Sequence, residues 1–305
     1  MEHNLMYGGL LYEKSNNIGD EIQSLAAEQH LPSVTQYFER DSLRSATAKE
    51  PHIVILNGWF SWHPEQTFPA GQAISPIFFG FHITDWNASS NYFLSADCIN
   101  YFKQHQPIGC RDETTANVLR ERGVDVFCSR CLTLTFPRRS APPADGRVFV
   151  VDAKHIPIPG SLRDRAIRLS HGMKAIYGAA TKREAAREVL SLYRNQAHLV
   201  ITTRLHCALP CVAMGIPVIF FGDPDDHRVS ILKDIGVPVY PEPPRLLKSL
   251  YRLAAKYFPG FYMRGINWDP EPVDFEDEKA KMLTRLHDML KQTEQRISQM
   301  REHAD

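Results

Sequence analysis

The fold is decided by residues 198–210, HLVITTRLHCALP, and by their continuation at 215–221, GIPVIFF. The apolar runs at 199–201 and 218–221 are continuous, which is typical of parallel strands covered on both faces. Between the two runs lie small residues that end at Gly215, a pattern that predicts a short helix with a glycine stop. The stretch therefore predicts a strand–helix–strand unit of an α/β sheet.

Two polar side chains, Arg204 and His206, directly follow the first of these strands. We expect Pro210 in the first turn of the helix, because its missing N–H has no intrahelical partner there. Arg204 and His206 then lie at the carboxyl end of a strand and the amino end of a helix. Open α/β sheets bind anionic ligands at this place, because free N–H groups and the helix dipole both point outward.

Two further segments join a strand end to polar residues. Residues 17–21, NIGDE, follow a predicted strand at 7–14, and Asp20 is expected to be the N-cap of the next helix. This loop has one glycine where a dinucleotide fingerprint needs three, so an ordinary capped helix is an equal alternative to a phosphate cradle. Residues 107–115, PIGCRDETT, place Arg111 at a strand end in the way that Arg204 is placed. A weak surface ion pair between Arg111 and its neighbour Asp112 is the alternative.

Taken together and in this order, the segments at 17–21, 107–115 and 203–210 resemble the polysaccharide pyruvyl transferase family, over roughly residues 5–235. The resemblance implies transfer of a pyruvyl group from phosphoenolpyruvate to two hydroxyls of a sugar, which gives a cyclic ketal and releases phosphate. It implies no cofactor beyond phosphoenolpyruvate as co-substrate, and a sugar or a lipid-linked glycan as acceptor. By matching position it assigns catalysis to His206 and donor binding to Arg204, Leu205 (through its backbone), Arg111 and Gly19.

This chemistry needs a group of adjustable protonation, because the enol methylene must gain a proton. The helix dipole disfavours an imidazolium at His206 by about 0.3–1 kcal/mol. A donor phosphate about 4 Å away, at an effective dielectric of about 20, favours it by about 4 kcal/mol per unit charge. We therefore expect the bound donor to raise the pKa of His206 and keep it protonated. In the structural alternative, Arg204 pairs with a carboxylate and His206 bonds a carbonyl.

Other strand ends supply candidates for the acceptor side. Apolar strands at 52–56 and 76–79 each lead to a glycine beside polar or aromatic residues, which suggests loops that line one cleft. A tryptophan offers a flat apolar face for a sugar ring, although packing is its commoner role, and a satisfied structural histidine is the commoner reading of a lone imidazole. The candidate acceptor-side residues are Asn17, Asp20, Asn57, Trp59 and His82.

The alternation of strands and helices predicts an α/β protein with two doubly wound Rossmann-like domains that face a cleft. This layout resembles glycosyltransferase B. The polar, proline-containing segment 138–146 is the best linker. We expect an N-terminal domain at 1–140, with the acceptor side and Arg111, a C-terminal donor-side domain at 146–250, and a helical extension at 251–305.

The local sequence pattern predicts three further elements. Within the second domain we expect a helix around 161–170 and a strand at 173–177. Residues 274–303 predict one long charged helix whose apolar face is formed by Leu283, Leu286, Leu290, Ile297 and Met300. That face is expected to dock on the body of the protein.

The composition limits the function further. Lys and Arg number 35, as do Asp and Glu, so the formal net charge is zero, which argues against nucleic acid as a partner. No apolar run approaches the roughly 20 residues that span a bilayer, and no leader pattern is present, so we expect a cytoplasmic protein. A lipid-linked acceptor leaves peripheral membrane association open. Six cysteines make no disulfide framework, and Cys128 and Cys131 form half a zinc motif without a second pair, so no metal is expected.

Two other function classes suit the same architecture. A nucleotide-sugar-dependent glycosyltransferase would use Arg204 for a diphosphate, but neither a ribose-binding carboxylate pair nor a base-stacking site can be placed. A non-catalytic carbohydrate-binding or assembly protein would keep the fold without turnover. In that case His206→Ala changes no activity.

Overall fold

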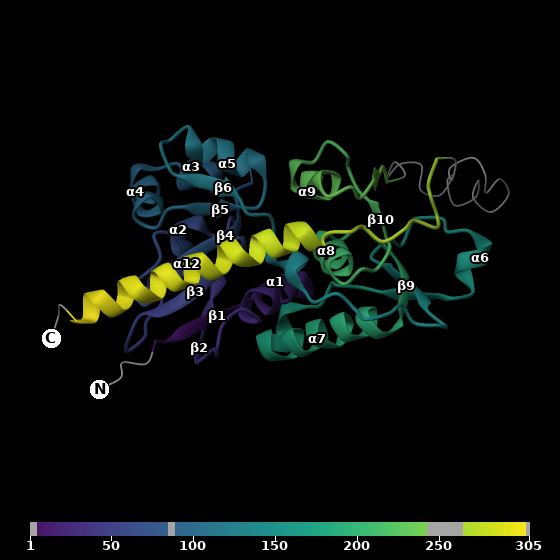
Figure 1. Cartoon of the computed structure of the whole chain (residues 1–305), viewed down its shortest axis with the longest axis horizontal. Coiled ribbons are helices and arrows are strands. Elements are labelled where there is room, and N and C mark those ends of the chain that lie inside the picture. The colour runs from purple at the N-terminus through teal and green to yellow at the C-terminus, as the bar shows by residue number, and fades with distance from the viewer. Residues whose placement is uncertain (1–4, 85–88, 243–264, 303–305) are drawn as a thin grey trace. The chain divides into compact units, whose positions relative to one another are not determined.

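A computed structural model describes residues 5–84, 89–242 and 265–302. The chain divides into two compact units. Unit 1 comprises residues 1–15, 20–135 and 277–305, and unit 2 comprises residues 16–19 and 136–276. Each unit is built on a parallel sheet with helices interleaved between its strands (Figure 1), which confirms the predicted α/β class.

Unit 1 carries a six-stranded sheet in the order β2-β1-β3-β4-β5-β6. Its strands are β1 (Tyr7–Leu11), β2 (Gln36–Glu39), β3 (His52–Trp59), β4 (Ile74–His82), β5 (Ile108–Cys110) and β6 (Val126–Cys128). Its α-helices are α1 (Ile18–Glu28, which starts in the 16–19 segment), α2 (Pro64–Thr67), α3 (Ser89–Phe93), α4 (Ala96–Gln104), α5 (Glu113–Arg120) and α12 (Glu276–Glu302). Two 3₁₀ turns, η1 (Arg40–Ser45) and η2 (Leu132–Thr135), complete it.

Unit 2 carries a five-stranded sheet in the order β11-β10-β9-β7-β8. Its strands are β7 (Arg147–Val151), β8 (Ala166–Leu169), β9 (Ala197–Thr202), β10 (Val218–Phe221) and β11 (Val239–Tyr240). The described part of unit 2 contains the helices α6 (Gly160–Arg163), α7 (Gly178–Gln196), α8 (Leu205–Ala213) and α9 (Ser230–Asp234), with 3₁₀ turns η3 (Ala175–Tyr177) and η4 (His227–Val229).

The two sheets share one strand order. Numbered within its own unit, each runs 2-1-3-4-5, and unit 1 adds a sixth strand. The order therefore reverses between β1 and β3 in unit 1 and between β7 and β9 in unit 2. Ligands of open α/β sheets bind at such a reversal, beyond the carboxyl ends of the strands. Each sheet thus has its own candidate ligand position, and the cleft between domains stays a prediction.

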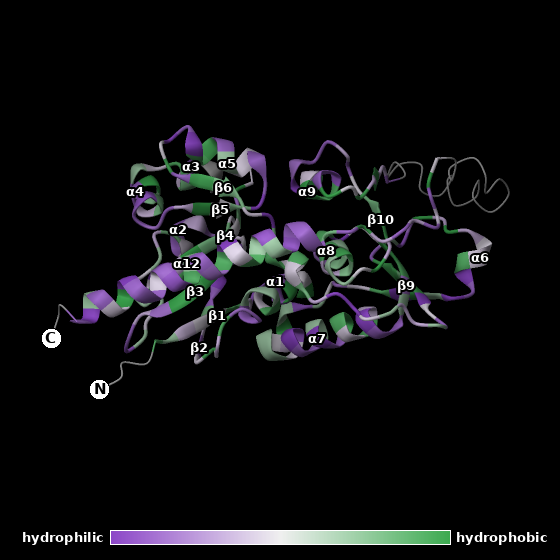
Figure 2. Cartoon of the chain, viewed as in Figure 1, coloured by the Kyte–Doolittle hydropathy of each residue, from purple (hydrophilic) through white to green (hydrophobic). Residues whose placement is uncertain are grey.

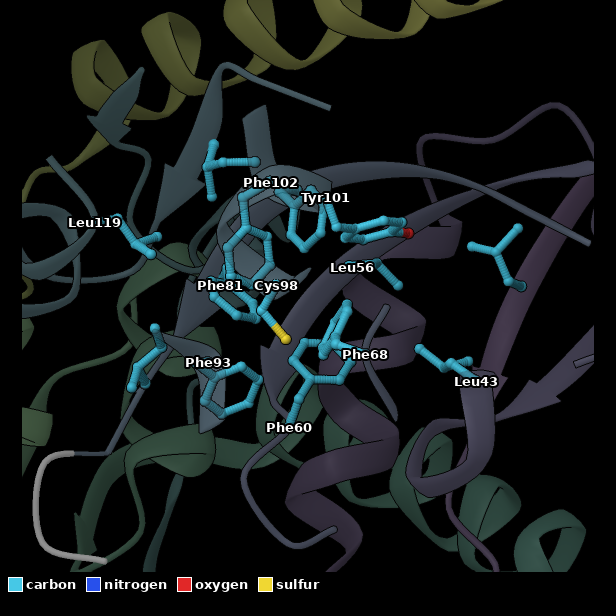
Figure 3. Close-up of a cluster of buried hydrophobic side chains, with 14 of the residues drawn as sticks. Leu43, Leu56, Phe60, Phe68, Phe81, Phe93, Cys98, Tyr101, Phe102 and Leu119 are labelled. Atoms are coloured by element: carbon cyan, nitrogen blue, oxygen red, sulfur yellow. The ribbon is translucent and has the colours of Figure 1, made fainter. Parts of the chain in front are cut away.

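Aromatic side chains dominate the core of unit 1 (Figure 3). The ring of Phe68 lies 5.4 Å from that of Phe60 and 5.8 Å from that of Phe81, and Phe81 lies 5.4 Å from Phe102. Such pairs contribute about 0.5–1.5 kcal/mol each beyond the area they bury. Phe81 precedes the last residue of β4, so this cluster fixes the carboxyl end of that strand.

The core of unit 2 is mainly aliphatic. It is formed by alternate residues of adjacent strands, among them Val148, Val150, Leu199, Ile201 and Ile219. These residues come from the continuous apolar runs that the sequence contains, and both β9 and β10 form where those runs predict strands. In Figure 2 hydrophobic residues, in green, are frequent along β9 and β10, whereas α12 is largely hydrophilic, in purple.

The long helix predicted at 274–303 is confirmed as α12, and it belongs to unit 1 rather than to a separate extension. Leu286 and Leu290 are buried, and Glu294 accepts a hydrogen bond from the Tyr7 hydroxyl at 2.8 Å. Met300, predicted on the docking face, is 67% exposed, so the apolar contact ends before it, although Arg301 Nη2 still lies 2.6 Å from Glu50 Oε2. The predicted boundary at 250/251 lies outside the described residues.

Two element predictions in unit 2 are wrong. Instead of a helix over 161–170, the chain forms the short α6 and then β8, which pairs in parallel with β7 along its whole length. Instead of a strand over 173–177, it forms η3. The N–H groups of Met173 and Ala175 donate to Asn16, at 2.9 and 2.8 Å, so they are used in a loop contact rather than in a sheet.

Candidate functional site

The segment Arg204–His206 lies at the carboxyl end of β9 and the start of α8, as predicted. Arg204 occupies the N-cap position, and its side chain makes no capping hydrogen bond. Its carbonyl accepts from the N–H groups of Cys207 and Ala208, both at 3.0 Å. Because the first N–H groups of a helix have no carbonyl partner within it, this end of α8 is suited to an anion.

Pro210 is not in the first turn: it is the sixth residue of α8. A proline inside a helix lacks its N–H, and its ring presses on the carbonyl four residues earlier. That residue is His206, whose φ of −82° and ψ of 17° depart from helical values. The helix is therefore distorted at the candidate catalytic histidine, which is half-buried.

Arg204 is anchored by Asp152, a residue that the sequence analysis missed. Its Nε donates to Asp152 Oδ2 at 2.6 Å. Asp152 follows β7 and Arg204 follows β9, the two strands between which the sheet order reverses. The Arg204 side chain is 42% exposed, and its two terminal nitrogens have no partner among the described residues. The carboxylate pairing expected in the structural alternative thus exists, but it leaves the outer edge of the guanidinium for a ligand.

Asp152 is held in an uncommon backbone conformation, with φ of 54°. Non-glycine residues rarely adopt this left-handed region, at a cost of order 1 kcal/mol, and they gather at functional sites. Its carboxylate accepts from Ser170 Oγ at 2.6 Å and from the His171 N–H at 3.1 Å. Burial alone would raise the pKa of Asp152, but the hydrogen bonds from Ser170 and Arg204 outweigh it and lower the pKa. A single aspartate after a strand carries no sequence signal that marks this role.

The first three residues of the N-terminal motif, 17–19, lie beside His206 within unit 2. The structure groups residues 16–19 with this unit, although the sequence placed them in the first domain. A Cβ added to Gly19 would lie 3.2 Å from the His206 Cβ, closer than nearly all such contacts. The Gly19 N–H donates to Asn17 Oδ1 at 3.1 Å, so Asn17 caps α1. Residues 17–19 of the N-terminal motif therefore meet the motif at 203–210 within unit 2.

Asp20 is the third residue of α1 and not its N-cap. It belongs to a cluster at the carboxyl edge of the sheet of unit 1, where Arg40 Nη1 lies 3.6 Å from Asp20 Oδ2. The Arg40 guanidinium also lies 4.9 Å from the Tyr12 ring centroid and 5.7 Å from that of Trp59. Burial opposes the charge of Arg40, but neighbouring carboxylates led by Asp20 outweigh it and raise the pKa of the guanidinium.

The two acceptor-side candidates of β3 have different surroundings. Trp59 is half-buried, and its indole N–H donates to Thr84 Oγ1 at 2.9 Å. Asn57 is buried, and its amide donates to the Gln23 carbonyl at 3.1 Å and accepts from the Leu132 N–H at 3.2 Å. Both ends of the Asn57 amide therefore serve the interior of unit 1, and the geometry assigns it a structural role.

His82 and Arg111 lie in unit 1, with Asp112 between them. His82 Nδ1 is 2.6 Å from Asp112 Oδ2, and Asp112 Oδ1 accepts from the Thr115 N–H at 2.9 Å, which caps α5. Burial alone would raise the pKa of Asp112, but His82 outweighs it and lowers the pKa to about 2. Arg111 is 4% exposed and lies 3.8 Å from Asp112, so the ion pair exists and is buried rather than on the surface. The joint action of Arg111 with Arg204 stays a prediction.

The cysteine pair shows ordinary buried-thiol surroundings. Cys131 is buried and its thiol donates to Asn57 Oδ1 at 3.5 Å. Burial raises the pKa of both the Cys128 and the Cys131 thiol. Within the described part of the chain, no group of three His, Cys, Asp or Glu side chains is arranged to hold a metal ion.

Fold and site define a protein of two α/β units with an arginine and a histidine at the strand-order reversal of the second sheet. The family model "Polysaccharide pyruvyl transferase" matches residues 17–225. The chain belongs to the polysaccharide pyruvyl transferase family, as the three motifs predicted. No curated protein matches the sequence.

Several solved structures are similar at low sequence identity. A functionally uncharacterised protein from Klebsiella pneumoniae subsp. pneumoniae NTUH-K2044 has a TM-score of 0.43 and 15% identity, over 74% of this chain and 88% of that one. A protein described as a UDP-N-acetylglucosamine 2-epimerase from Listeria monocytogenes has a TM-score of 0.44 and 10% identity, over 94% and 97%. Another UDP-N-acetylglucosamine 2-epimerase has a TM-score of 0.43 and 9% identity, over 93% of this chain and 95% of that one. Among the described helices, none has the length and apolar character to cross a membrane.

Proposed function

We propose that the chain transfers a pyruvyl group from phosphoenolpyruvate to a sugar of a polysaccharide or glycan precursor, forming a pyruvate ketal. Family membership supports a pyruvyl transferase. The observation that carries the donor assignment is the Arg204 side chain, which is fixed at Nε by Asp152 and open at both terminal nitrogens among the described residues. A planar fork held in this way suits a carboxylate or a phosphate.

The donor carries both of these groups, and the start of α8 offers a second kind of contact. The backbone N–H groups of the first turn, including that of Leu205, lie at the positive end of the helix dipole. Arg204 and Leu205 would thus bind the two anionic groups of one small molecule. Gly19 keeps the space beside His206 free of a side chain.

His206 is the proton donor in this mechanism. It gives a proton to the donor methylene while a sugar hydroxyl oxygen bonds to the neighbouring carbon, and the proton of that hydroxyl returns to the imidazole. A second sugar hydroxyl then forms the other C–O bond as the C–O bond to phosphate breaks, and its proton leaves with the phosphate. The ketal contains both sugar oxygens, and no oxidant or reductant is required.

Incubation of the protein with phosphoenolpyruvate and candidate sugars, followed by mass spectrometry, tests the proposal. We expect one pyruvate ketal per acceptor and one phosphate released. Arg204→Lys and His206→Ala should abolish most turnover, whereas His198→Ala, at the amino end of the same strand, should not. Release of a nucleotide from sugar nucleotides, without reaction of phosphoenolpyruvate, would instead indicate a glycosyltransferase. No turnover of either donor would indicate a non-catalytic protein.

A further inference from the structure

We propose that Asp152 is a positioning residue. Its carboxylate holds the Arg204 side chain and, through the backbone of His171, fixes that side chain relative to the N-terminal motif at residues 17–19. The effect on the donor rests on the function proposed above, but the structural link does not. Asp152 touches no expected substrate group itself, because its oxygens are taken up by Arg204, Ser170 and His171.

The first half of the link is the clamp on Arg204. A free arginine side chain samples many rotamers, and fixing one before the ligand arrives lowers the entropy lost on binding. Of the Arg204 guanidinium nitrogens, Asp152 Oδ2 accepts a hydrogen bond from Nε alone, at 2.6 Å. The backbone adds to the clamp, since the Thr203 N–H donates to the Val151 carbonyl at 3.4 Å and the Arg204 N–H to Thr202 Oγ1 at 3.0 Å. The turn after β9 is thereby tied to the end of β7.

The second half runs through His171 to the N-terminal motif. The His171 N–H donates to Asp152 Oδ2, and the His171 carbonyl accepts from the Ile18 N–H at 2.9 Å. Asn17 forms an antiparallel bridge with Gly172 next to it. The backbone of one residue, His171, therefore connects the carboxylate that holds Arg204 to the loop that lies against His206.

His171 is itself rigidly held, so it can transmit the position of the carboxylate. It is fully buried, its Nε2 lies 2.9 Å from the Tyr193 hydroxyl, and the two rings stack. The Cys207 thiol donates to the same hydroxyl at 3.4 Å. Because Cys207 follows His206 directly, the network runs from Arg204, the N-cap of α8, back to the third residue of that helix.

A double-mutant cycle separates positioning from a general structural role. In the wild-type background, Asp152→Ala should weaken phosphoenolpyruvate binding by about tenfold or more, measured by calorimetry. In an Arg204→Ala background the same change should have an effect of less than about twofold, because the residue through which Asp152 acts is gone. Asp152→Asn, which keeps the shape, should restore part of the affinity. Asp164→Ala, an exposed carboxylate of the same unit, is the matched control.

Amide hydrogen exchange tests the link without substrate. Asp152→Ala should speed exchange at Ile18, two hydrogen bonds away, while Asp164→Ala should leave it unchanged. Unchanged exchange at Ile18 would overturn the coupling to the motif. Equal or tighter donor binding by Asp152→Ala would overturn the positioning of Arg204, since the carboxylate would then act only as a nearby negative charge. If the wild type binds no phosphoenolpyruvate, the proposed function is wrong. The hydrogen-exchange rate at Ile18 then decides by itself whether Asp152 is coupled to the N-terminal motif.

Discussion

Pro210 lies four residues after His206 in α8, and His206 is the residue at which that helix departs from helical backbone angles. The proline causes the departure, because its ring occupies the space that the His206 carbonyl would take in a regular helix. The backbone conformation of the candidate proton donor is thus set by a proline one turn away. Neither residue alone would indicate this.

Pro210→Ala should lower activity without unfolding the protein. Loss of buried ring carbons costs about 1–2 kcal/mol, and relief of the broken helix offsets a similar amount. We therefore expect a small change in unfolding free energy but a fall in kcat/KM of about tenfold or more, because His206 moves into helical geometry. Urea unfolding measures the change in unfolding free energy, and phosphate-release kinetics measure the change in kcat/KM. Pro224→Ala, in the loop after β10, is the control, and an equal loss of activity there would count against the relationship.

Gly19→Ala should distinguish the effect of residue 19 on the stability of α1 from its effect on the geometry around His206. Alanine stabilises the first turn of α1 relative to glycine by up to about 1 kcal/mol. The new Cβ would lie 3.1 Å from the Asn17 amide and 3.2 Å from the His206 Cβ, so those side chains must shift. We expect reduced kcat with little loss of thermal stability. Gly160→Ala, where nothing lies within 4 Å of the added Cβ, should leave kcat unchanged.

Asp112→Asn should remove a pH-dependent part of the stability. The pKa of Asp112 is about 2 in the folded chain against 3.8 for the free group, which corresponds to about 2 kcal/mol. Because the folded pKa is depressed, this contribution is present above about pH 4 and is lost as the pH falls towards 2. Asparagine still caps α5. The stability gap between wild type and variant should therefore close between pH 4 and pH 2, with Asp125→Asn as control. A gap that stays constant over this range would refute the assignment.

Leu286→Ala should show that α12 is part of unit 1. Leu286 is fully buried, so its truncation is expected to cost about 2–5 kcal/mol of unfolding free energy. Leu283→Ala, at a half-buried position of the same helix, should cost less. Denaturant unfolding of the two variants gives the comparison. Equal and small losses would mean that the helix does not stabilise unit 1.

Part of the site was predictable because local sequence dictates it. Short apolar runs rich in β-branched residues and bounded by turn residues favour strands covered on both faces, so β9 and β10, and with them the position of Arg204, could be predicted from the chain alone. The predicted helix at 161–170 failed for the converse reason. Residues 166–169 form a short edge strand whose partner, β7, is remote in sequence, and local pattern does not encode that pairing.

The sequence by itself determined the α/β class, the strand–helix placement of Arg204 and His206, and the family, because each depends on short-range patterns. Only the tertiary structure decided that Asp152 holds Arg204, that Asn57 serves the interior, and that Gly19 lies against His206. These contacts join residues that the chain separates by tens to more than a hundred positions. They arise because parallel strands bring their carboxyl ends to one edge of a sheet, wherever those strands stand in the sequence.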